Sequence, residues 1–282
     1  MSDDGWSVEL ESKKRLCSLP REWVQTTRTL FDRIIRRVMR SLGYDVISRS
    51  KYGYDPFLDI QKLSLAWGTP VNSFFDVGAN DGQTSSAANR YFPGARICAF
   101  EPHSPTFERL AQRMARCSGF SCYNFALGSE NGSVTFYEYD ESVLNSLIPN
   151  AQYAVRFGKD ARKLRARCVT LDVFCTSNEI KRIDVLKIDT EGFELEVMKG
   201  AANLLKTGAI SFVYLEFNDV QPGENAAGGA LGPVAQLLRE YGVRFVASYN
   251  DYIVSEGQFF NVSNALFALA PAGSSSNPAA VK

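Results

Sequence analysis

Three acidic side chains stand where two apolar segments of the chain end. Asp189 and Glu191 follow the run Asp184–Ile188, and Glu216 closes the run that begins at Phe212. Ligands bind beyond the carboxyl ends of the strands in an open α/β sheet, so acids at these places are candidates for chemistry. A carboxylate there can accept the proton of a hydroxyl group or orient its oxygen. We expect Asp189 to be the catalytic base, with Glu191 second and Glu216 facing the same acceptor.

Each acid also has a plainer interpretation. Asp189 or Glu191 could cap the helix expected to begin near Gly192, because acids favour a helix N-terminus. For Glu191 both interpretations stay open, whereas Asp189 is favoured for chemistry because it is nearest the strand end. Asp189 and Glu216 could also hold a divalent cation that lowers the pKa of a hydroxyl, although no residue pattern establishes a metal. Lys187, inside the strand, could pair with one of these acids.

A turn rich in glycine, from Asp76 to Gly82, begins within the last residues of the apolar run Ser73–Val77. Glycine removes Cβ atoms where a backbone turn approaches a ligand closely. A dinucleotide fingerprint needs further glycines, but Asn80 and Gln83 occupy those positions. The turn therefore fits a ligand that has a charged amino-acid end and no pyrophosphate, such as S-adenosylmethionine. We expect four residues to hold that end of the ligand: Asp76, Gly78, Asn80 and Gly82.

Glu101 ends the next apolar run, Ile97–Phe100, 19 residues after Gly82. The spacing is close to the offset of about 20 residues between a glycine turn and the carboxylate that accepts ribose hydroxyls. We expect Glu101 to hold the ribose, the alternative being a surface carboxylate at a strand end. After the third run, three residues are expected to border the adenine: Asn124, Phe125 and Ala126. His103 is expected to be a solvated loop residue, and Glu194 is expected to be solvated or ion-paired.

Four blocks of the chain together resemble a known family. They are Phe75-Asp76-Val77-Gly78-Ala79-Asn80-Asp81-Gly82, Phe100-Glu101-Pro102, Asn124-Phe125-Ala126-Leu127-Gly128 and Asp184-Val185-Leu186-Lys187-Ile188-Asp189-Thr190-Glu191-Gly192-Phe193-Glu194. In these blocks, the segment of roughly Val71 to Phe217 resembles the FkbM-type S-adenosylmethionine-dependent methyltransferases. The resemblance implies S-adenosylmethionine as cofactor and O-methylation of a hydroxyl on a sugar, glycan or glycosylated natural product.

Two other functions stay open at this point. A nicotinamide-dependent oxidoreductase or epimerase of Rossmann type is disfavoured by Asn80 and Gln83 in the turn. A non-catalytic binding module could keep the cofactor fold without turnover. Titration with S-adenosylhomocysteine and with NAD would separate the first of these from a methyltransferase.

The order of apolar and amphipathic segments predicts a Rossmann-like class I methyltransferase fold of the α/β class, with a mostly parallel seven-stranded sheet flanked by helices. Strands are expected at Ser73–Val77, Ile97–Phe100, Phe120–Asn124, Asp184–Ile188, Ile210–Phe217, Arg244–Ser248 and Leu266–Ala270. Helices are expected near Ser85, Thr106, Phe193 and Val234, the first of them capped by Thr84. An insertion at about residues 133–171 would pair Ser133–Tyr139 with Arg167–Leu171.

The domain is expected to span residues 71–271, between poorly ordered ends at 1–21 and 272–282 and behind an N-terminal extension at 22–70. Glu22–Leu42 reads as a basic amphipathic helix ended by Gly43. Its apolar stripe could pack against protein, which is the favoured interpretation, or rest on anionic lipid as a peripheral membrane contact. The aromatic segment Tyr44–Trp67 could form a lid, although packing on the domain is favoured.

Composition limits the partners and the compartment. The 282 residues carry 31 Lys and Arg against 31 Asp and Glu, so no overall basic field indicates nucleic acid. The six cysteines form no C-x-x-C pair, which favours a reducing compartment. From the polar first residues we expect no secretory signal. We expect a cytoplasmic protein, in the lipid-binding case at the inner face of the membrane, with a small-molecule or glycan acceptor. Oligomeric state and acceptor identity cannot be read from these residues.

Overall fold

The structure is a computed structural model that describes residues 33–46, 48, 50–139, 145–148, 161–218, 231–255 and 258–271. The chain divides into two units, Met1–Lys51 and Tyr52–Lys282. In the first unit, residues 33–41 form a helix. Gly43 ends it with φ +83°, and the Tyr44 amide donates to the carbonyl oxygen of Met39 at 2.9 Å. The helix end at Gly43 is therefore confirmed, while the expected segments 1–21 and 272–282 lie outside the described residues.

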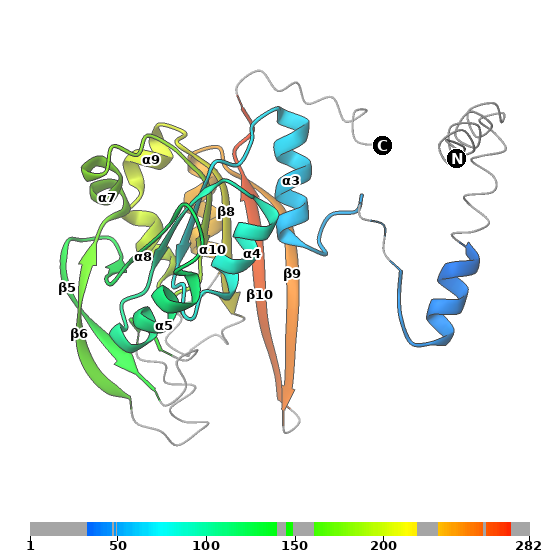
Figure 1. Cartoon of the computed structure of the whole chain (residues 1–282), viewed down its shortest axis with the longest axis horizontal. Helices are drawn as coiled ribbons and strands as arrows, with labels where there is room; N and C mark the ends of the chain where they lie inside the picture. The colour runs from blue at the N-terminus through cyan, green and yellow to red at the C-terminus, as the bar shows by residue number, and fades with distance from the viewer. Residues whose placement is uncertain are drawn as a thin grey trace, which may run out of the picture. The chain divides into compact units, whose positions relative to one another are not determined.

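The second unit is built on a seven-stranded sheet in the order β3-β2-β1-β7-β8-β10-β9 (Figure 1). Its strands are β1 (Ser73–Val77), β2 (Arg96–Phe100), β3 (Phe120–Tyr123), β7 (Ile183–Ile188), β8 (Ile210–Asn218), β9 (Arg244–Ser255) and β10 (Gln258–Ala268). All neighbouring pairs are parallel except those that β10 makes with β8 and β9. The predicted mostly parallel sheet is confirmed.

Helices cover both faces of this sheet. On one face lie α3 (Pro56–Trp67), α4 (Gln83–Tyr91) and α5 (Ser104–Met114), and on the other lie α7 (Leu171–Ser177), α8 (Glu194–Lys199), α9 (Ala202–Lys206) and α10 (Leu231–Glu240). Strand β7 is buried along its whole length, which is why its sequence is a continuous apolar run interrupted only at two charged positions. The strand order reverses between β1 and β7, and a crevice for ligands is expected at such a switch point.

The inserted segment and the short strand before it form a second, three-stranded sheet in the order β4-β6-β5. Its strands are β4 (Ala126–Leu127), β5 (Gly132–Glu138) and β6 (Arg162–Val169). The strand expected at Arg167–Leu171, as the partner of Ser133–Tyr139, begins and ends earlier in the chain, at Arg162 and Val169. Thr170 ends the strand because its side chain accepts from the Val173 amide and caps α7.

Other element boundaries also differ from the predictions. Thr84 does not cap α4, because the helix already begins at Gln83 and its N-cap is Gly82, which has no side chain to accept a hydrogen bond. Strands β9 and β10 extend well beyond the predicted Arg244–Ser248 and Leu266–Ala270, because antiparallel backbone pairing continues as far as Gln258 and Ser255.

The aromatic N-terminal arm packs on the domain along α3. Trp67 stacks on Phe212 of the sheet with ring centroids 5.5 Å apart, and Phe57 stacks on Tyr91 at 5.0 Å. Asp55 caps the helix by accepting from the amides of Phe57 and Leu58. These contacts support the packing interpretation of this segment. Among the described helices, none is both long and apolar enough to cross a membrane.

Candidate functional site

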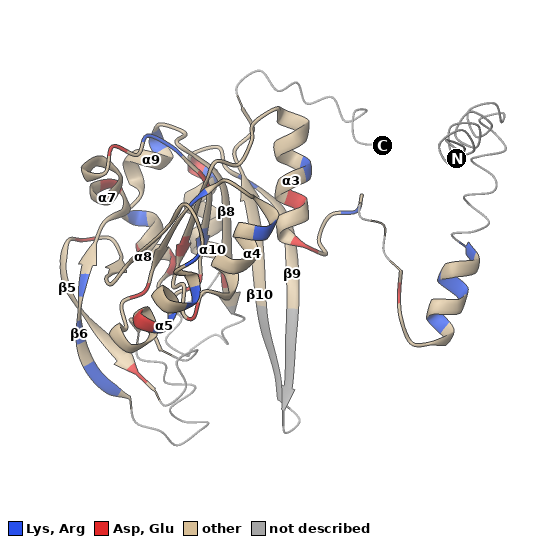
Figure 2. Ribbon diagram, in the orientation of Figure 1, with Lys and Arg blue, Asp and Glu red and all other residues tan. Residues whose placement is uncertain are grey.

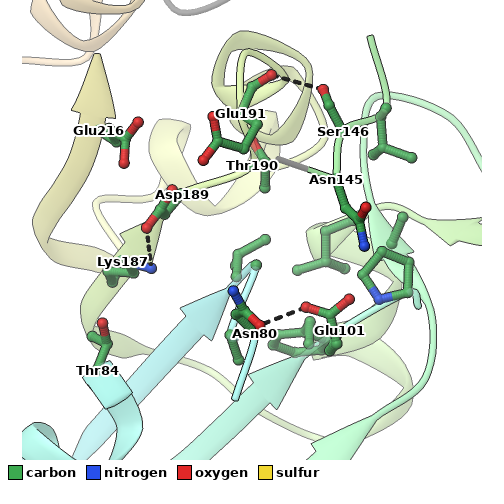
Figure 3. A pocket seen from close by; sticks show the side chains of 18 of the residues that line it. Asn80, Thr84, Glu101, Asn145, Ser146, Lys187, Asp189, Thr190, Glu191 and Glu216 are labelled. Carbon is green, nitrogen blue, oxygen red and sulfur yellow. Dashed lines mark hydrogen bonds and ion pairs between the residues drawn. The ribbon is translucent and has the colours of Figure 1, made fainter. Parts of the chain in front are cut away.

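A cavity of about 330 Å³ opens at the carboxyl ends of β1, β2, β7 and β8 (Figure 3). Its volume is at the lower end of the range of about 300–1,000 Å³ that is usual for small-molecule sites. Eight of the eleven residues expected at the site line it: Gly78, Asn80, Glu101, Phe125, Ala126, Asp189, Glu191 and Glu216. The other three, Asp76, Gly82 and Asn124, do not line it.

Asp76 lies inside the protein behind the cavity. Its side chain is fully buried, accepts from the Ser85 hydroxyl at 2.6 Å and lies 3.4 Å from the Lys187 ammonium. Asp76 sits in the middle of the sheet at the position paired with Lys187 on β7, so its carboxylate meets that side chain rather than a ligand. The expectation that Asp76 contacts the ligand is corrected to a supporting role behind Lys187.

The glycines of the turn are required by the protein itself. A Cβ at Gly78, whose φ is +75°, would lie on the backbone carbonyl of Asp189, and a Cβ at Gly82 would lie 2.7 Å from Leu110 on α5. Gly82 therefore serves the packing of the turn against α5. At Gly78 the absent side chain lets the end of β1 approach the end of β7, and this brings Asp189 to the cavity.

Asn124 has a structural role at the end of β3. Its amide nitrogen donates to the carbonyl oxygens of Glu101 and Pro102, and its amide oxygen accepts from Ser104. These bonds hold the loop that carries Glu101, whereas the neighbouring residues Phe125 and Ala126 line the cavity. The expected adenine border is thus formed by two of its three residues.

Glu101 is buried and faces the glycine-rich turn. One of its oxygens accepts from the Asn80 amide at 3.0 Å and the other from the His103 amide at 2.9 Å (Figure 3). Burial raises the pKa of Glu101 to about 7, although these two amides act to lower it. A carboxylate offers about four acceptor positions, so two remain for hydroxyl groups of a ligand. The alternative of a surface carboxylate is excluded by this burial.

The sequence suggested that His103 is a solvated loop residue, but the structure shows that it is buried. Its ring nitrogens lie 2.7 Å from a Glu138 oxygen and 2.8 Å from the Thr106 hydroxyl, and the ring stacks on Phe136. Glu138 and Phe136 belong to the inserted strand β5, which is distant in sequence and covers the histidine. His103 therefore links the inserted sheet to the Glu101 loop.

At the other end of the cavity, three carboxylates lie close together. Oxygens of Asp189, Glu191 and Glu216 all lie within 4.8 Å of one another. Burial and the charges of Asp189 and Glu191 raise the pKa of Glu216 to about 10. Burial and the charges of Asp189 and Glu194 raise the pKa of Glu191 to about 8. Three such oxygens could hold a divalent cation, or they could share protons that keep two of the acids neutral.

The side chain of Lys187 places a positive charge beside these carboxylates. The ammonium lies 2.9 Å from an oxygen of Asp189 and 3.4 Å from an oxygen of Asp76, and the side chain is almost fully buried. Burial alone would lower the pKa of Lys187, but the carboxylates of Asp189 and Asp76 outweigh it and raise that pKa above its usual range. The lysine is therefore charged, and its ammonium forms a close ion pair with the carboxylate of Asp189.

The loop after β7 is held in a strained shape by its neighbours. Glu191 has a φ of +52°, a left-handed conformation that costs free energy for a residue with a side chain. The Ser146 hydroxyl donates to the Glu191 carbonyl at 2.7 Å (Figure 3), and a buried Glu194 oxygen accepts from the amides of Thr190 and Gly192. The surrounding bonds thus direct the Glu191 side chain toward Asp189.

These contacts also decide two alternatives that the sequence left open. Helix α8 begins at Glu194, and its N-cap, Phe193, makes no side-chain hydrogen bond. Neither Asp189 nor Glu191 therefore caps this helix. Glu194 was expected to be solvated or ion-paired, but it is buried and accepts hydrogen bonds from amides of the loop. The position of Glu194 at the start of the helix could have predicted this role. Its carboxylate closely follows Thr190 and Gly192, whose backbone amides need acceptors.

Comparison with known proteins agrees with this site. The model of the Methyltransferase FkbM domain family matches residues 76–245. Hexuronic acid methyltransferase AglP of Haloferax volcanii is 27% identical over 161 residues, which cover 57% of this chain and 62% of that protein. Methyltransferase sdnD of Sordaria araneosa is 34% identical over 158 residues, covering 46% and 61%.

A third relative, 2-O-methyltransferase NoeI of Sinorhizobium fredii, is 24% identical over 160 residues, covering 53% of this chain and 65% of that protein. The chain thus spans less than two thirds of the length of these relatives. The family model, however, covers more than half of the chain and includes the glycine-rich turn, Glu101 and the three carboxylates. The chain belongs to the FkbM methyltransferase family.

Proposed function

We propose that this protein is an S-adenosylmethionine-dependent O-methyltransferase whose acceptor is a hydroxyl of a sugar, glycan or glycosylated natural product. The observation that carries the proposal is the place of Asp189. Its carboxylate lies at the end of β7, in the cavity, beside the ammonium of Lys187 and among two further carboxylates. A base at that place can take a proton from a hydroxyl that lies in the cavity.

The residues at the Glu101 end of the cavity fit such a methyl donor. Buried Glu101 keeps acceptor positions for the two ribose hydroxyls, and Phe125 and Ala126 supply an apolar border for a flat base. Gln83 and Thr84 line the cavity at the N-terminus of α4, where free amides and the helix dipole favour a carboxylate. These features suit the three parts of S-adenosylmethionine.

The chain's contribution to the reaction would be alignment and proton removal. S-adenosylmethionine, when bound, supplies a methyl group on a positively charged sulfur. Asp189 would orient the acceptor hydroxyl and take its proton, while the ammonium of Lys187, 2.9 Å from an Asp189 oxygen, would hold that carboxylate in place. Glu216, whose pKa is raised to about 10, would remain protonated and could donate a hydrogen bond to the acceptor oxygen or to Asp189.

The acceptor class rests on the relatives. One is named a hexuronic acid methyltransferase and another a 2-O-methyltransferase, and they match 57% and 53% of this chain. The polar groups at the acid end of the cavity suit an acceptor with several hydroxyls, because they can bond a hydroxyl as donor or as acceptor. The proposed substrate is therefore a sugar-like compound.

The decisive experiment follows the methyl group. The enzyme is incubated with methyl-labelled S-adenosylmethionine and a polysaccharide and metabolite extract, and the products are analysed by mass spectrometry. We expect label on an oxygen of a sugar-containing product, and calorimetric binding of S-adenosylhomocysteine but not NAD. Glu101→Ala should remove the binding. Binding of NAD alone would replace the proposal with the oxidoreductase function, and label on nitrogen or carbon would refute O-methylation.

A further inference from the structure

The helix of residues 33–41 has two chemically different faces. Three apolar side chains recur every fourth residue and are half exposed or more: Ile34 (55%), Val38 (52%) and Leu42 just after the helix (64%). At 100° per residue these three fall on one stripe, together with the partly exposed Ile35 and Met39. The helix therefore presents an apolar stripe to its surroundings.

The opposite face of the same helix is basic. It carries Arg33, Arg36, Arg37 and Arg40, and residues 33–44 contain no acid. Figure 2 shows Lys and Arg positions as blue segments of the ribbon along this short helix. Four of the 31 basic residues of a chain with zero net charge thus gather in nine residues. This density creates a local positive field that the whole chain does not have.

The contacts of the arginines within their own unit leave most of this charge uncompensated. Arg36 donates to the carbonyl oxygen of Val46, and Arg40 forms an exposed pair with Asp45 at 3.0 Å. Only one carboxylate is therefore paired with four guanidinium groups among the described residues of the unit. A long arginine side chain can keep its charged end at a polar surface while its stem lies along apolar groups.

We propose that the surface formed by residues 33–44 binds an anionic lipid bilayer, with the helix lying flat at the interface. Its nine described helical residues extend over about 14 Å at 1.5 Å per residue, with the apolar and basic faces running side by side along that length. The apolar stripe enters the headgroup boundary and the arginines contact lipid phosphates. Exposed Tyr44, at the end of the helix, suits the same interface.

Charge favours lipid over a second copy of this chain as the partner of this stripe. A second copy of this chain would bring another four arginines to the same place, which would repel the first set. An anionic bilayer complements both faces at once, because it offers negative phosphates beside an apolar interior. The proposal concerns this surface alone and does not depend on the proposed reaction.

The test is flotation of the full chain with vesicles. One set is pure phosphatidylcholine, and the other contains about one third phosphatidylglycerol, whose charge attracts arginine side chains. We expect binding to the anionic vesicles only, and its loss when salt rises from about 0.1 M to about 1 M, because the Debye length falls from about 10 Å to about 3 Å.

Paired variants assign the binding to this surface. Arg33→Gln/Arg37→Gln should weaken it roughly thirtyfold, at about fivefold for each arginine. The matched control Arg113→Gln/Arg116→Gln, which removes two exposed charges from the second unit, should have no effect. Ile34→Ser/Val38→Ser should also weaken binding, whereas Leu65→Ser, at a position that is 84% exposed on α3, should not.

Unchanged S-adenosylhomocysteine binding and circular dichroism would show that each variant is folded. Several results would overturn the proposal. These are no binding to either vesicle, equal binding to both, equal loss in the variants and their controls, or a dimer that Ile34→Ser/Val38→Ser dissociates while flotation is absent.

Discussion

The ammonium of Lys187 lies 2.9 Å from a carboxylate oxygen of Asp189 and 3.4 Å from one of Asp76. One buried cation thus connects a carboxylate at the cavity with a carboxylate in the interior of the sheet. Lys187 can reach both because it and Asp76 are paired across β1 and β7, while Asp189 follows two residues later on the same face of the chain. Removal of any one of these charges should affect the other two.

The first prediction concerns Asp189. Asp189→Asn keeps the size of the side chain but removes the base, so kcat should fall by about 10²–10⁴, the usual contribution of a positioned base. Binding of S-adenosylhomocysteine should stay close to that of the wild type. Labelled-methyl turnover and calorimetry measure the two effects. Glu196→Gln on α8, also a charge removal, should keep full turnover; if Asp189→Asn does as well, the base is another residue.

Lys187 should matter for stability as well as for turnover. Lys187→Met leaves the carboxylate of Asp76 buried without a positive partner, and an unpaired buried charge costs about 3–5 kcal/mol. Urea denaturation measures the loss in unfolding free energy. The double variant Lys187→Met/Asp76→Asn should recover part of it. Lys199→Met breaks only the surface pair with Glu196 and should cost less than about 1 kcal/mol; equal losses at the two lysines would contradict the buried pair.

The raised pKa of Glu216 predicts how stability changes with pH. Burial and the charges of Asp189 and Glu191 raise the pKa of Glu216 from its ordinary value of 4.5 to about 10 in the folded protein, so between these values the folded state holds a proton that the unfolded state has lost. The unfolding free energy contributed by this group therefore falls as the pH rises. Glu216→Gln cannot titrate, so its Tm relative to the wild type should rise between about pH 6 and about pH 9. A constant difference in Tm would show that Glu216 is not protonated in the folded state.

Gly78 should not tolerate a side chain. In Gly78→Ala the new Cβ would lie on the Asp189 carbonyl, so the ends of β1 and β7 must separate and turnover should be lost together with several kcal/mol of stability. Gly94→Ala is the matched control, because Gly94 has a similar φ of +89° but open space around it. It should cost only the left-handed backbone penalty of about 1–2 kcal/mol. Similar denaturation midpoints for both variants would disprove the close approach.

Cation binding at the three carboxylates should compete with protons. Near neutral pH, Glu191 and Glu216 hold protons, because their pKa values are about 8 and about 10. A divalent cation must displace those protons, so its affinity should rise steeply with pH. Turnover at neutral pH should therefore survive chelation, and Mn²⁺ binding, measured by calorimetry, should strengthen toward pH 9 and disappear in Glu216→Gln. Loss of turnover on chelation at neutral pH would instead make the cation part of the catalytic site.

The sequence by itself determined the sheet and the ends of its central strands. The runs Ser73–Val77 and Asp184–Ile188 are short and almost continuously apolar, a pattern typical of a strand covered on both faces, and both agree with the structure to within one residue. Ligands of such sheets bind at the carboxyl ends of the strands, so Glu101, Asp189 and Glu216 could be named as candidates from their positions alone.

Tertiary structure decided what each polar residue does. Asp76 and Asp189 are both acids beside glycines in the sequence, yet one is enclosed by Ser85 and Lys187 and the other lines the cavity. The burial of His103 and Glu194 could not be predicted, because their contacts form only on folding. His103 is covered by the inserted strand β5, and Glu194 accepts from amides of the Thr190–Gly192 loop. Local spacing reports which strand end a residue occupies. Burial and charge partners arise from segments distant in the chain, so they appear only when the sheet and its insertion are assembled.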